Sequence, residues 1–273
     1  MEPAGLSVGI VGLASLFNDA VDCFEYVQIG RNFGKSFQTS VLKLDSARLR
    51  LSRWGESVGL SSNLGDVQTL QQAQRVGPDR SVQAAEKLLG QILELFNEAE
   101  GVPIGFRTWH HESGNEASLA VYDAQNDLDP KAASLHQKMR DLSIRRQNHI
   151  GLRQKAKWAL YEEKHFKQLI ATVTNLVDNL IGLFPAVQET QRQLAENEVS
   201  EIAEETASLP DLKPVVAGMD PELEAAVDMA LRKTSLPSPT SAHTVFSGNN
   251  NRGFQLGQII GNISNLKFGV DDS

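Results

Sequence analysis

The chain lacks a second cysteine and lacks a surplus of basic residues, and both absences narrow its possible functions. Cys23 is the only cysteine among 273 residues, so no disulfide can form within the chain, which fits a reducing compartment. Lys and Arg total 26 against 34 Asp and Glu, which gives a formal net charge of −8. Because this balance leaves no overall positive charge to neutralise phosphates, we expect no general affinity for nucleic acid.

Basic residues are also missing from the start of the chain, where Glu2 is the only early charge. A secretory signal peptide needs a basic region before its apolar stretch and a small-residue cleavage site after it. Neither is evident, so we expect no signal peptide and a cytoplasmic protein at rest. The glycosylation pattern at Asn262 then carries no weight, because it matters only in a secreted chain.

Motifs for catalysis and cofactor binding are lacking as well. The sequence has no phosphate-binding loop, dinucleotide fingerprint or nucleophile elbow. His110, His111 and Glu112 form the nearest approach to a metal cluster, but adjacent histidine side chains diverge and no further ligand motif lies nearby. We interpret these three residues as part of a solvated loop, and we expect no enzyme activity, no cofactor and no metal site.

Aromatic residues make up only 6% of the chain and hydrophobic residues 41%, so Leu, Ile, Val and Ala must fill most of the core. These residues recur at helical spacing along the body, which we define as residues 1–233. The spacing predicts helices over residues 4–30, 36–58, 81–100, 131–161, 166–184, 186–207 and 220–233. No strand pattern runs through the body, so the sequence predicts an all-α helical bundle.

The first predicted helix begins with an apolar stretch that has no charge from Ala4 to Asn18. These fifteen residues span about 22 Å as a helix, which is shorter than the roughly 30 Å hydrocarbon core of a bilayer. Gly5 and Gly9 form a G-x-x-x-G pair, which lets helices approach closely in lipid. The stretch is therefore a candidate for membrane insertion.

Two interpretations of this helix stay open, and they are compatible. The acids that follow, Asp19, Asp22 and Glu25, suit a helix packed against other helices, and an apolar run of this length is ordinary in a soluble core. A terminal helix packed at rest can also be released to insert. The residues expected to carry insertion are Ala4, Gly5, Gly9, Ile10, Val11, Gly12, Leu13, Leu16 and Phe17.

The tail, residues 234–273, has a different composition from the body. Residues 234–247 are rich in Pro, Ser and Thr and are predicted to form a flexible linker, and residues 248–269 are rich in Asn, Gln and Gly. Such a segment can stack in register with copies of itself, so that backbones pair and amides form ladders. The expected amyloid core is Gly253, Phe254, Gln255, Leu256, Gly257, Gln258, Ile259, Ile260, Gly261, Asn262 and Ile263. An inert, disordered tail is the alternative.

Two segments of the body invite a second interpretation. Val27-Gln28-Ile29-Gly30 resembles Phe254-Gln255-Leu256-Gly257 of the tail, but it ends a strongly helical segment, so we interpret it as helix and cap. The basic runs at residues 145–146 and 155–157 are interpreted as a solvated helix face. Docking on anionic lipid is the functional alternative for these runs.

Three separated blocks of the body resemble the HeLo domain of fungal heterokaryon-incompatibility proteins, the HET-S-like prion-inhibition and propagation family. The blocks are residues 16–34, residues 47–56, and Arg145-Arg146-Gln147 with Lys157-Trp158-Ala159-Leu160-Tyr161 and Phe184-Pro185; the resemblance covers roughly residues 1–230. The tail departs from HET-S, which ends in two pseudo-repeats of a β-solenoid. Here Phe254-Gln255-Leu256-Gly257 is similar to the tetrad of the fungal RHIM-related (PP-type) amyloid motif, with Phe in the first place.

This resemblance implies a cell-death execution protein with an α-helical, membrane-targeting HeLo domain. In the family, assembly of the tail is thought to free the N-terminal helix, which inserts and permeabilises the plasma membrane. The implied partners are other copies of the chain, a NOD-like receptor with a matching amyloid motif, and plasma-membrane lipid. The implied insertion segment is Ala4 to Gly30, and the implied location on activation is the plasma membrane.

The alternative function is a prion-propagating or adaptor protein that assembles through its tail without forming pores. HeLo domains also occur in forms that cannot kill. An assembled tail without relocation of the protein to the membrane would distinguish this function from pore formation.

Overall fold

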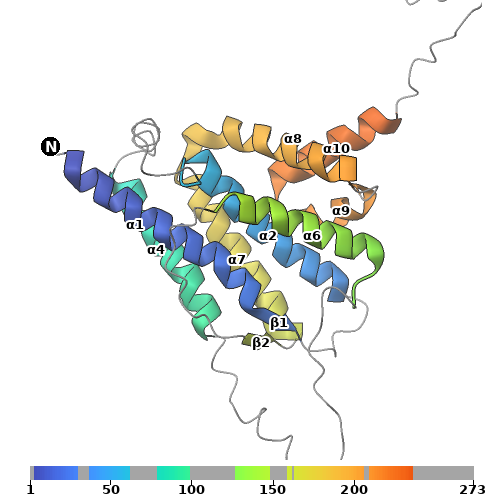
Figure 1. Cartoon of the computed structure of the whole chain (residues 1–273), viewed down its shortest axis with the longest axis horizontal. Helices are drawn as coiled ribbons and strands as arrows, with labels where there is room; N and C mark the ends of the chain where they lie inside the picture. The colour runs from blue at the N-terminus through green and yellow to red at the C-terminus, as the bar shows by residue number, and fades with distance from the viewer. Residues whose placement is uncertain are drawn as a thin grey trace, which may run out of the picture. The chain divides into compact units, whose positions relative to one another are not determined.

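The computed structural model of the chain describes residues 3–29, 37–61, 79–98, 127–147, 159–161, 163–205 and 209–235. Helices account for nearly all of them (Figure 1). The elements in chain order are α1 (Pro3–Asp22), the 3-10 helix η1 (Cys23–Tyr26), β1 (Val27–Ile29), α2 (Phe37–Ser57), α4 (Asp79–Glu98), α6 (Pro130–Arg145), β2 (Ala159–Tyr161), α7 (Glu163–Gly182), the 3-10 helix η4 (Pro185–Val187), α8 (Gln188–Glu205), α9 (Leu209–Val216) and α10 (Pro221–Ser235).

The all-α prediction is confirmed, because the periodic apolar positions do form a helical core. In α4, for example, Val82, Ala85, Leu89, Ile92 and Phe96 are buried at intervals of three and four residues, which places them on one face. At the start of α6, the Asp129 side chain accepts hydrogen bonds from the backbone N–H groups of residues 131 and 132, and Pro130 occupies the first turn.

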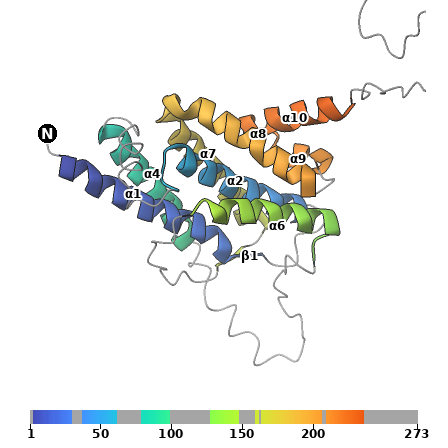
Figure 2. The same ribbon diagram turned by 45° about the horizontal axis from the view of Figure 1, so that its top comes forward.

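Helix α2 forms the centre of the bundle. It contacts α1, α6, α7, α8 and α9, and Figures 1 and 2 show it enclosed between α6 and α7. Most of its side chains are buried, including Arg48, Arg50 and Arg53. The buried arginines of this helix must find internal partners, because burying an unpaired charge costs several kcal/mol.

The prediction of one helix over residues 4–30 is wrong at its C-terminal end. The α-helix ends at Asp22, a 3-10 turn follows, and Val27–Ile29 forms a strand that pairs in parallel with Ala159–Tyr161. The interpretation of Val27-Gln28-Ile29-Gly30 as helix and cap is therefore wrong for its first three residues. β-Branched Val27 and Ile29 favour an extended backbone, and the pairing supplies their hydrogen bonds.

The predicted helix over residues 131–161 is also too long. Helix α6 ends at Arg145, and residues 159–161 form β2. Helix α9 is absent from the predicted helices, and its sequence contains Pro210 and Pro214. Pro210 lies in the first turn of α9, where no backbone N–H is needed, while Pro214 lies inside the helix.

The chain divides into two compact units, Met1–Leu231 and Arg232–Ser273. Beyond Ser235, the second unit lies outside the described residues, and so do the predicted linker and amyloid core, Gly253 to Ile263. His110, His111 and Glu112 also lie outside them.

Within the described ranges, no single helix combines the length and hydropathy expected of a membrane span. One bent pair meets the test together: Glu163–Gly182 and Pro185–Glu204, which meet at an angle of 91°.

Candidate functional site

The inner face of α1 packs into the bundle, mainly against α4 and also against α2. Leu13, Phe17, Ala20 and Val21 are fully buried, and Leu16 is partly buried against the same core. Gly12 is exposed. Of the predicted insertion residues, Ala4, Gly5, Gly9, Ile10 and Val11 lie on α1, but their side chains are outside the described set. Leu13, Leu16 and Phe17 thus serve the resting core, as the core-helix interpretation requires.

Phe17 occupies a seat formed by two consecutive residues of α2, Trp54 and Gly55, which we call the α1 seat. The rings of Phe17 and Trp54 meet edge to face, with centroids 6.2 Å apart. A Cβ placed on Gly55 would lie only 2.2 Å from Cζ of Phe17, so the ring fits because residue 55 has no side chain. Trp54 also packs on Phe184, with ring centroids 5.7 Å apart.

The acids after the apolar stretch face other helices, as predicted. Glu25 accepts hydrogen bonds from Arg48 of α2 and Arg140 of α6, and Asp22 accepts one from the Gln147 side chain at 2.6 Å. Burial opposes ionisation of Glu25, but hydrogen bonds and charges from the two arginines outweigh it and lower the pKa of Glu25. These contacts anchor the C-terminal end of α1 and η1.

Burial and neighbouring acids shift two other groups in this region. Burial, together with the charge of Asp22, raises the pKa of Asp19. Burial, followed by the charges of Asp19 and Asp22, raises the pKa of the Cys23 thiol to about 12. Cys23 is buried and free, so its thiol is protected from reaction at neutral pH while this region is closed.

A histidine–aspartate pair lies beside the Glu25 contacts. Nδ1 of His136 in α6 lies 2.7 Å from Oδ2 of Asp45 in α2. Burial lowers the pKa of His136, but the hydrogen bond and charge of Asp45 outweigh burial and leave that pKa raised. Arg140 and Glu25 act on the same imidazole in opposite directions. The contact between the imidazole and the Asp45 carboxylate therefore links α2 and α6.

Beside the α1 seat lies the buried ion cluster, which consists of Arg53, Arg146, Glu198 and Asp220. The Arg53 guanidinium donates to Oε2 of Glu198 at 2.6 Å and to Oδ2 of Asp220 at 2.8 Å, and all three side chains are fully buried. Burial lowers the pKa of Arg53, but the charges of Asp220 and Glu198 dominate and raise it. The cluster joins α2 to α8 and to the residue that precedes α10.

Arg146 corrects the interpretation of residues 145–146 as a solvated helix face. Its guanidinium is buried and donates to Glu56 and to Glu198. Only Arg145 fits the prediction, since it is exposed and pairs with Glu201 at the surface. The other basic run, residues 155–157, lies outside the described residues. Sequence reasoning missed the cluster because its partners are separated by 52 to 167 residues.

Asp220 has a second role at the start of α10. Its carboxylate accepts a hydrogen bond from the backbone N–H of Leu223 at 3.2 Å, as a helix N-cap does. The same side chain binds Arg53, which immediately precedes Trp54 and Gly55. One short stretch of α2, residues 53–55, therefore holds both the start of α10 and Phe17 of α1.

Among the described residues, no group of three or more His, Cys, Asp or Glu side chains is placed to hold a metal ion. These residues instead form packing contacts and buried ion pairs between α1, α2 and the start of α10. The arrangement can hold an apolar helix in the core and connect it to the segment that leads into the tail.

Comparison with known proteins identifies the body. Residues 5–212 match the HeLo family, described as "Prion-inhibition and propagation". The chain belongs to the HeLo family. Within the tail of this HeLo protein, residues 239–265 match a second family, described as "SesB domain on fungal death-pathway protein". The resemblance to HET-S-like proteins seen in the sequence is thereby confirmed.

The HeLo chain is similar to two proteins of Podospora anserina. Heterokaryon incompatibility protein S of strain S is 36% identical over 225 residues, which cover 82% of this chain and 73% of that protein. Heterokaryon incompatibility protein s is 36% identical over 228 residues, with the same coverage.

Two solved structures are similar to this chain. The N-terminal domain of HET-s superposes with a TM-score of 0.68 at 34% identity, covering 81% of this chain and 98% of that one. A double mutant of that domain gives a TM-score of 0.67 at the same identity and coverage. These similarities support heterokaryon-incompatibility cell death as the general process in which this HeLo protein takes part.

Proposed function

We propose that this HeLo protein executes programmed cell death by permeabilising the plasma membrane with α1 after its tail has assembled. At rest the protein is cytoplasmic and α1 is packed in the bundle. A NOD-like receptor with a matching motif seeds amyloid assembly of Gly253 to Ile263, and further copies of the chain join. The single observation that carries the proposal is that residues 53–55 hold both Phe17 of α1 and Asp220 at the start of α10.

Release of α1 has to overcome a substantial packing energy. Leu13, Phe17 and Val21 are fully buried. Full burial of such a side chain contributes about 1.5–3 kcal/mol, so these three together contribute roughly 5–9 kcal/mol as an upper estimate. That value is comparable with the total stability of a domain, about 5–15 kcal/mol. A helix held this firmly stays in place until its seat is disturbed.

The ion cluster offers a way to disturb the seat. When tails stack, the bodies are crowded around the growing assembly. This crowding exerts a force on α10, the helix that precedes the tail. Displacement of Asp220 leaves Arg53 with an incomplete set of partners inside the core, which is strongly destabilising. Trp54 and Gly55 follow Arg53 directly on α2. A displacement of α2 at Arg53 therefore loosens the contact of these two residues with Phe17.

The dimensions of α1 suit insertion when its acids stay at the membrane surface. Its 20 residues span about 30 Å, which equals the thickness of the hydrocarbon core. Asp19 and Asp22 lie in its last turn, at the level of the lipid headgroups in this arrangement.

A non-lethal prion-propagating or adaptor function is the second candidate. It is favoured by the full burial of Leu13, Phe17, Ala20 and Val21, which gives α1 a place in the resting core. In that case the tail assembles while α1 stays in the core, and the cells remain alive.

Gly12 provides the test that separates the two functions. It is exposed on α1, and the nearest atom to an added Cβ is Oε1 of Glu86 at 3.9 Å, so Gly12→Lys leaves the resting core intact. A lysine near the centre of an inserted helix costs about 2.5–3.5 kcal/mol. Lysine at Leu13 is a poorer test, because that side chain is fully buried and its replacement destabilises the resting core.

The experiment expresses the full-length chain with a co-expressed seeding tail, residues 234–273, in fungal cells. The matched control is Gly90→Lys on α4, where an added Cβ meets nothing within 4 Å. We expect Gly12→Lys to form assemblies without killing, while wild type and Gly90→Lys relocate to the cell periphery and lyse the cell. Killing by Gly12→Lys at the wild-type rate would rule out insertion of α1. Healthy cells with wild-type assemblies would favour the adaptor function.

A further inference from the structure

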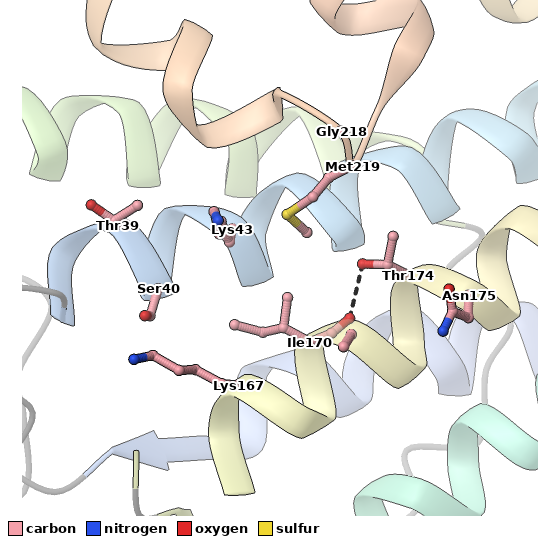
Figure 3. Close-up of a pocket in the computed structure, with 10 residues that line it drawn as sticks. Thr39, Ser40, Lys43, Lys167, Ile170, Thr174, Asn175, Gly218 and Met219 are labelled. Atoms are coloured by element: carbon pink, nitrogen blue, oxygen red, sulfur yellow. Dashed lines mark hydrogen bonds between the residues drawn. The ribbon is translucent and has the colours of Figure 1, made fainter. Parts of the chain in front are cut away.

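A cavity of about 560 Å³ lies between α2, α7 and the turn that joins α9 to α10 (Figure 3). Its volume falls in the range of small-molecule sites, roughly 300–1,000 Å³. It is lined by Thr39, Ser40 and Lys43 of α2, by Lys167, Ile170, Ala171, Thr174 and Asn175 of α7, and by Gly218 and Met219 of the turn. None of these residues belongs to the α1 seat or to the buried ion cluster.

The polar groups of the cavity are mostly hydrogen-bond donors. Two lysines, Lys43 and Lys167, come from facing helices, and the hydroxyl-bearing residues Thr39 and Ser40 of α2 also line the cavity. Figure 3 shows the Lys167 side chain extending toward α2 and the Ser40 hydroxyl pointing toward α7. Lysine and hydroxyl groups together are a common way to bind phosphate oxygens.

The charge of this lining is the reverse of the charge of the whole chain. The chain carries a net charge of −8, yet the described lining contains two lysines and no acid. Lys43 is partly buried and makes no ion pair with another described residue. Lys167 pairs with Glu163 one turn earlier, but both side chains are well exposed, and such a pair contributes only about 0.2–1 kcal/mol. An incoming anion can therefore take the place of that carboxylate.

Much of the remaining lining is apolar. Ile170, Ala171 and Met219 give the cavity an aliphatic wall, and the Thr174 hydroxyl donates to the backbone carbonyl of Ile170 at 2.8 Å. This combination of a cationic end and an aliphatic wall suits a compact organic anion better than a bare ion.

We infer that this cavity binds a phosphate group carried by a compact organic molecule, with Lys43 and Lys167 as the phosphate ligands. The phosphate can belong to a soluble phosphate ester or to a lipid headgroup. Met219 lines the cavity, and its carbonyl accepts a hydrogen bond from Arg50 at 2.8 Å. A bound molecule therefore joins α2 and α7 to the turn before Asp220 and stabilises the resting body.

The experiment measures binding to the freshly purified full-length chain. One arm titrates inorganic pyrophosphate by calorimetry and follows the thermal unfolding midpoint. The other arm measures co-sedimentation with phosphatidylcholine vesicles with and without 5% phosphatidylinositol 4-phosphate. The test variant is Lys43→Gln with Lys167→Gln. Its control is Lys87→Gln with Lys233→Gln, which removes the same charge from exposed sites that are not part of the lining.

A second test variant leaves the charge unchanged. Ala171 is exposed at the cavity wall, so Ala171→Phe fills the space without disturbing the core. We expect both test variants to weaken binding roughly tenfold or more, as loss of charge-assisted hydrogen bonds predicts, and the control to bind as wild type does.

The arms also identify the source of the phosphate. Binding of pyrophosphate, with a raised unfolding midpoint, assigns a soluble phosphate ester. Binding only to the vesicles that contain the phosphoinositide, lost in both test variants, assigns a lipid headgroup. Absence of binding in both arms overturns the inference, and so does an equal loss of binding in the test and control lysine variants.

Discussion

Replacement of Gly55 by alanine is expected to loosen α1 selectively, because the added methyl group collides with the ring of Phe17. A Cβ at position 55 would lie 2.2 Å from Cζ, 2.3 Å from Cε2 and 2.8 Å from Cε1 of that ring. Phe17 is fully buried and packed on Trp54, so its ring can yield only if α1 or Trp54 moves.

The size of the effect follows from two opposing contributions. Overpacking a core costs about 1–3 kcal/mol, and three contacts shorter than 3 Å place Gly55→Ala at the upper end of that range. Alanine is favoured over glycine inside a helix by about 1 kcal/mol. The net destabilisation is therefore about 2 kcal/mol, which shifts the equilibrium between closed and open forms roughly 30-fold.

Cys23 provides the assay, because it is the only cysteine and lies directly after α1. Its thiol is buried, with a pKa of about 12, whereas an exposed thiol has a pKa near 8.5. Alkylation at pH 8 therefore measures how often this region opens. We expect Gly55→Ala to be alkylated roughly 30-fold faster than wild type.

The control is Gly90→Ala. Its added Cβ meets no atom within 4 Å, so this substitution should slightly stabilise the fold. The collision itself is checked in a Phe17→Ala background, where Gly55→Ala should lose its effect because the ring is gone. An unchanged alkylation rate in Gly55→Ala, or an equal cost with and without Phe17, would refute the reasoning.

Three further predictions concern the ionic contacts. Asp220→Asn should destabilise the body by about 3–5 kcal/mol in urea unfolding, because Arg53 loses a buried partner, whereas Glu196→Gln in an exposed pair with Arg192 should change stability by less than about 1 kcal/mol. The His136–Asp45 pair stabilises the fold fully below the unfolded pKa of 6.5, and this contribution is lost as pH rises through the raised folded pKa. The stability advantage of wild type over His136→Gln should therefore shrink above pH 6.5, and an advantage independent of pH would contradict this assignment. Glu25 has a lowered folded pKa, so its contribution is present above 4.5 and lost as pH falls below that value; urea midpoints of wild type and Glu25→Gln should converge in acid.

Helices with one apolar face could be predicted from the sequence because their periodicity is local. The stripe of α4 from Val82 to Phe96 and the stripe of α7 from Phe166 to Ile181 both pack as expected. The same logic placed Leu13 and Phe17 in the resting core. The family could also be predicted from the sequence, because three blocks of residues resemble the HeLo domain in the same order.

The contacts that link these helices could not be predicted in the same way. Nothing near Arg53 in the sequence shows that it binds Glu198 and Asp220, which lie 145 and 167 residues away. Gly55 looks like an ordinary helix glycine until the position of Phe17 is known. Strand β1 was missed because three residues are too few for a period-2 pattern, and only its distant partner β2 makes them a strand.

The pairing of β1 with β2 limits how far α1 can travel. If β1 stays paired and Glu25 keeps its arginines while α1 leaves the core, the helix swings about residues 23–29 as a lever fixed at one end. The free end of a 20-residue helix then reaches about 30 Å from that hinge. Under the proposed mechanism, the bundle would then rest on the bilayer surface, with residues 23–29 facing the lipid headgroups.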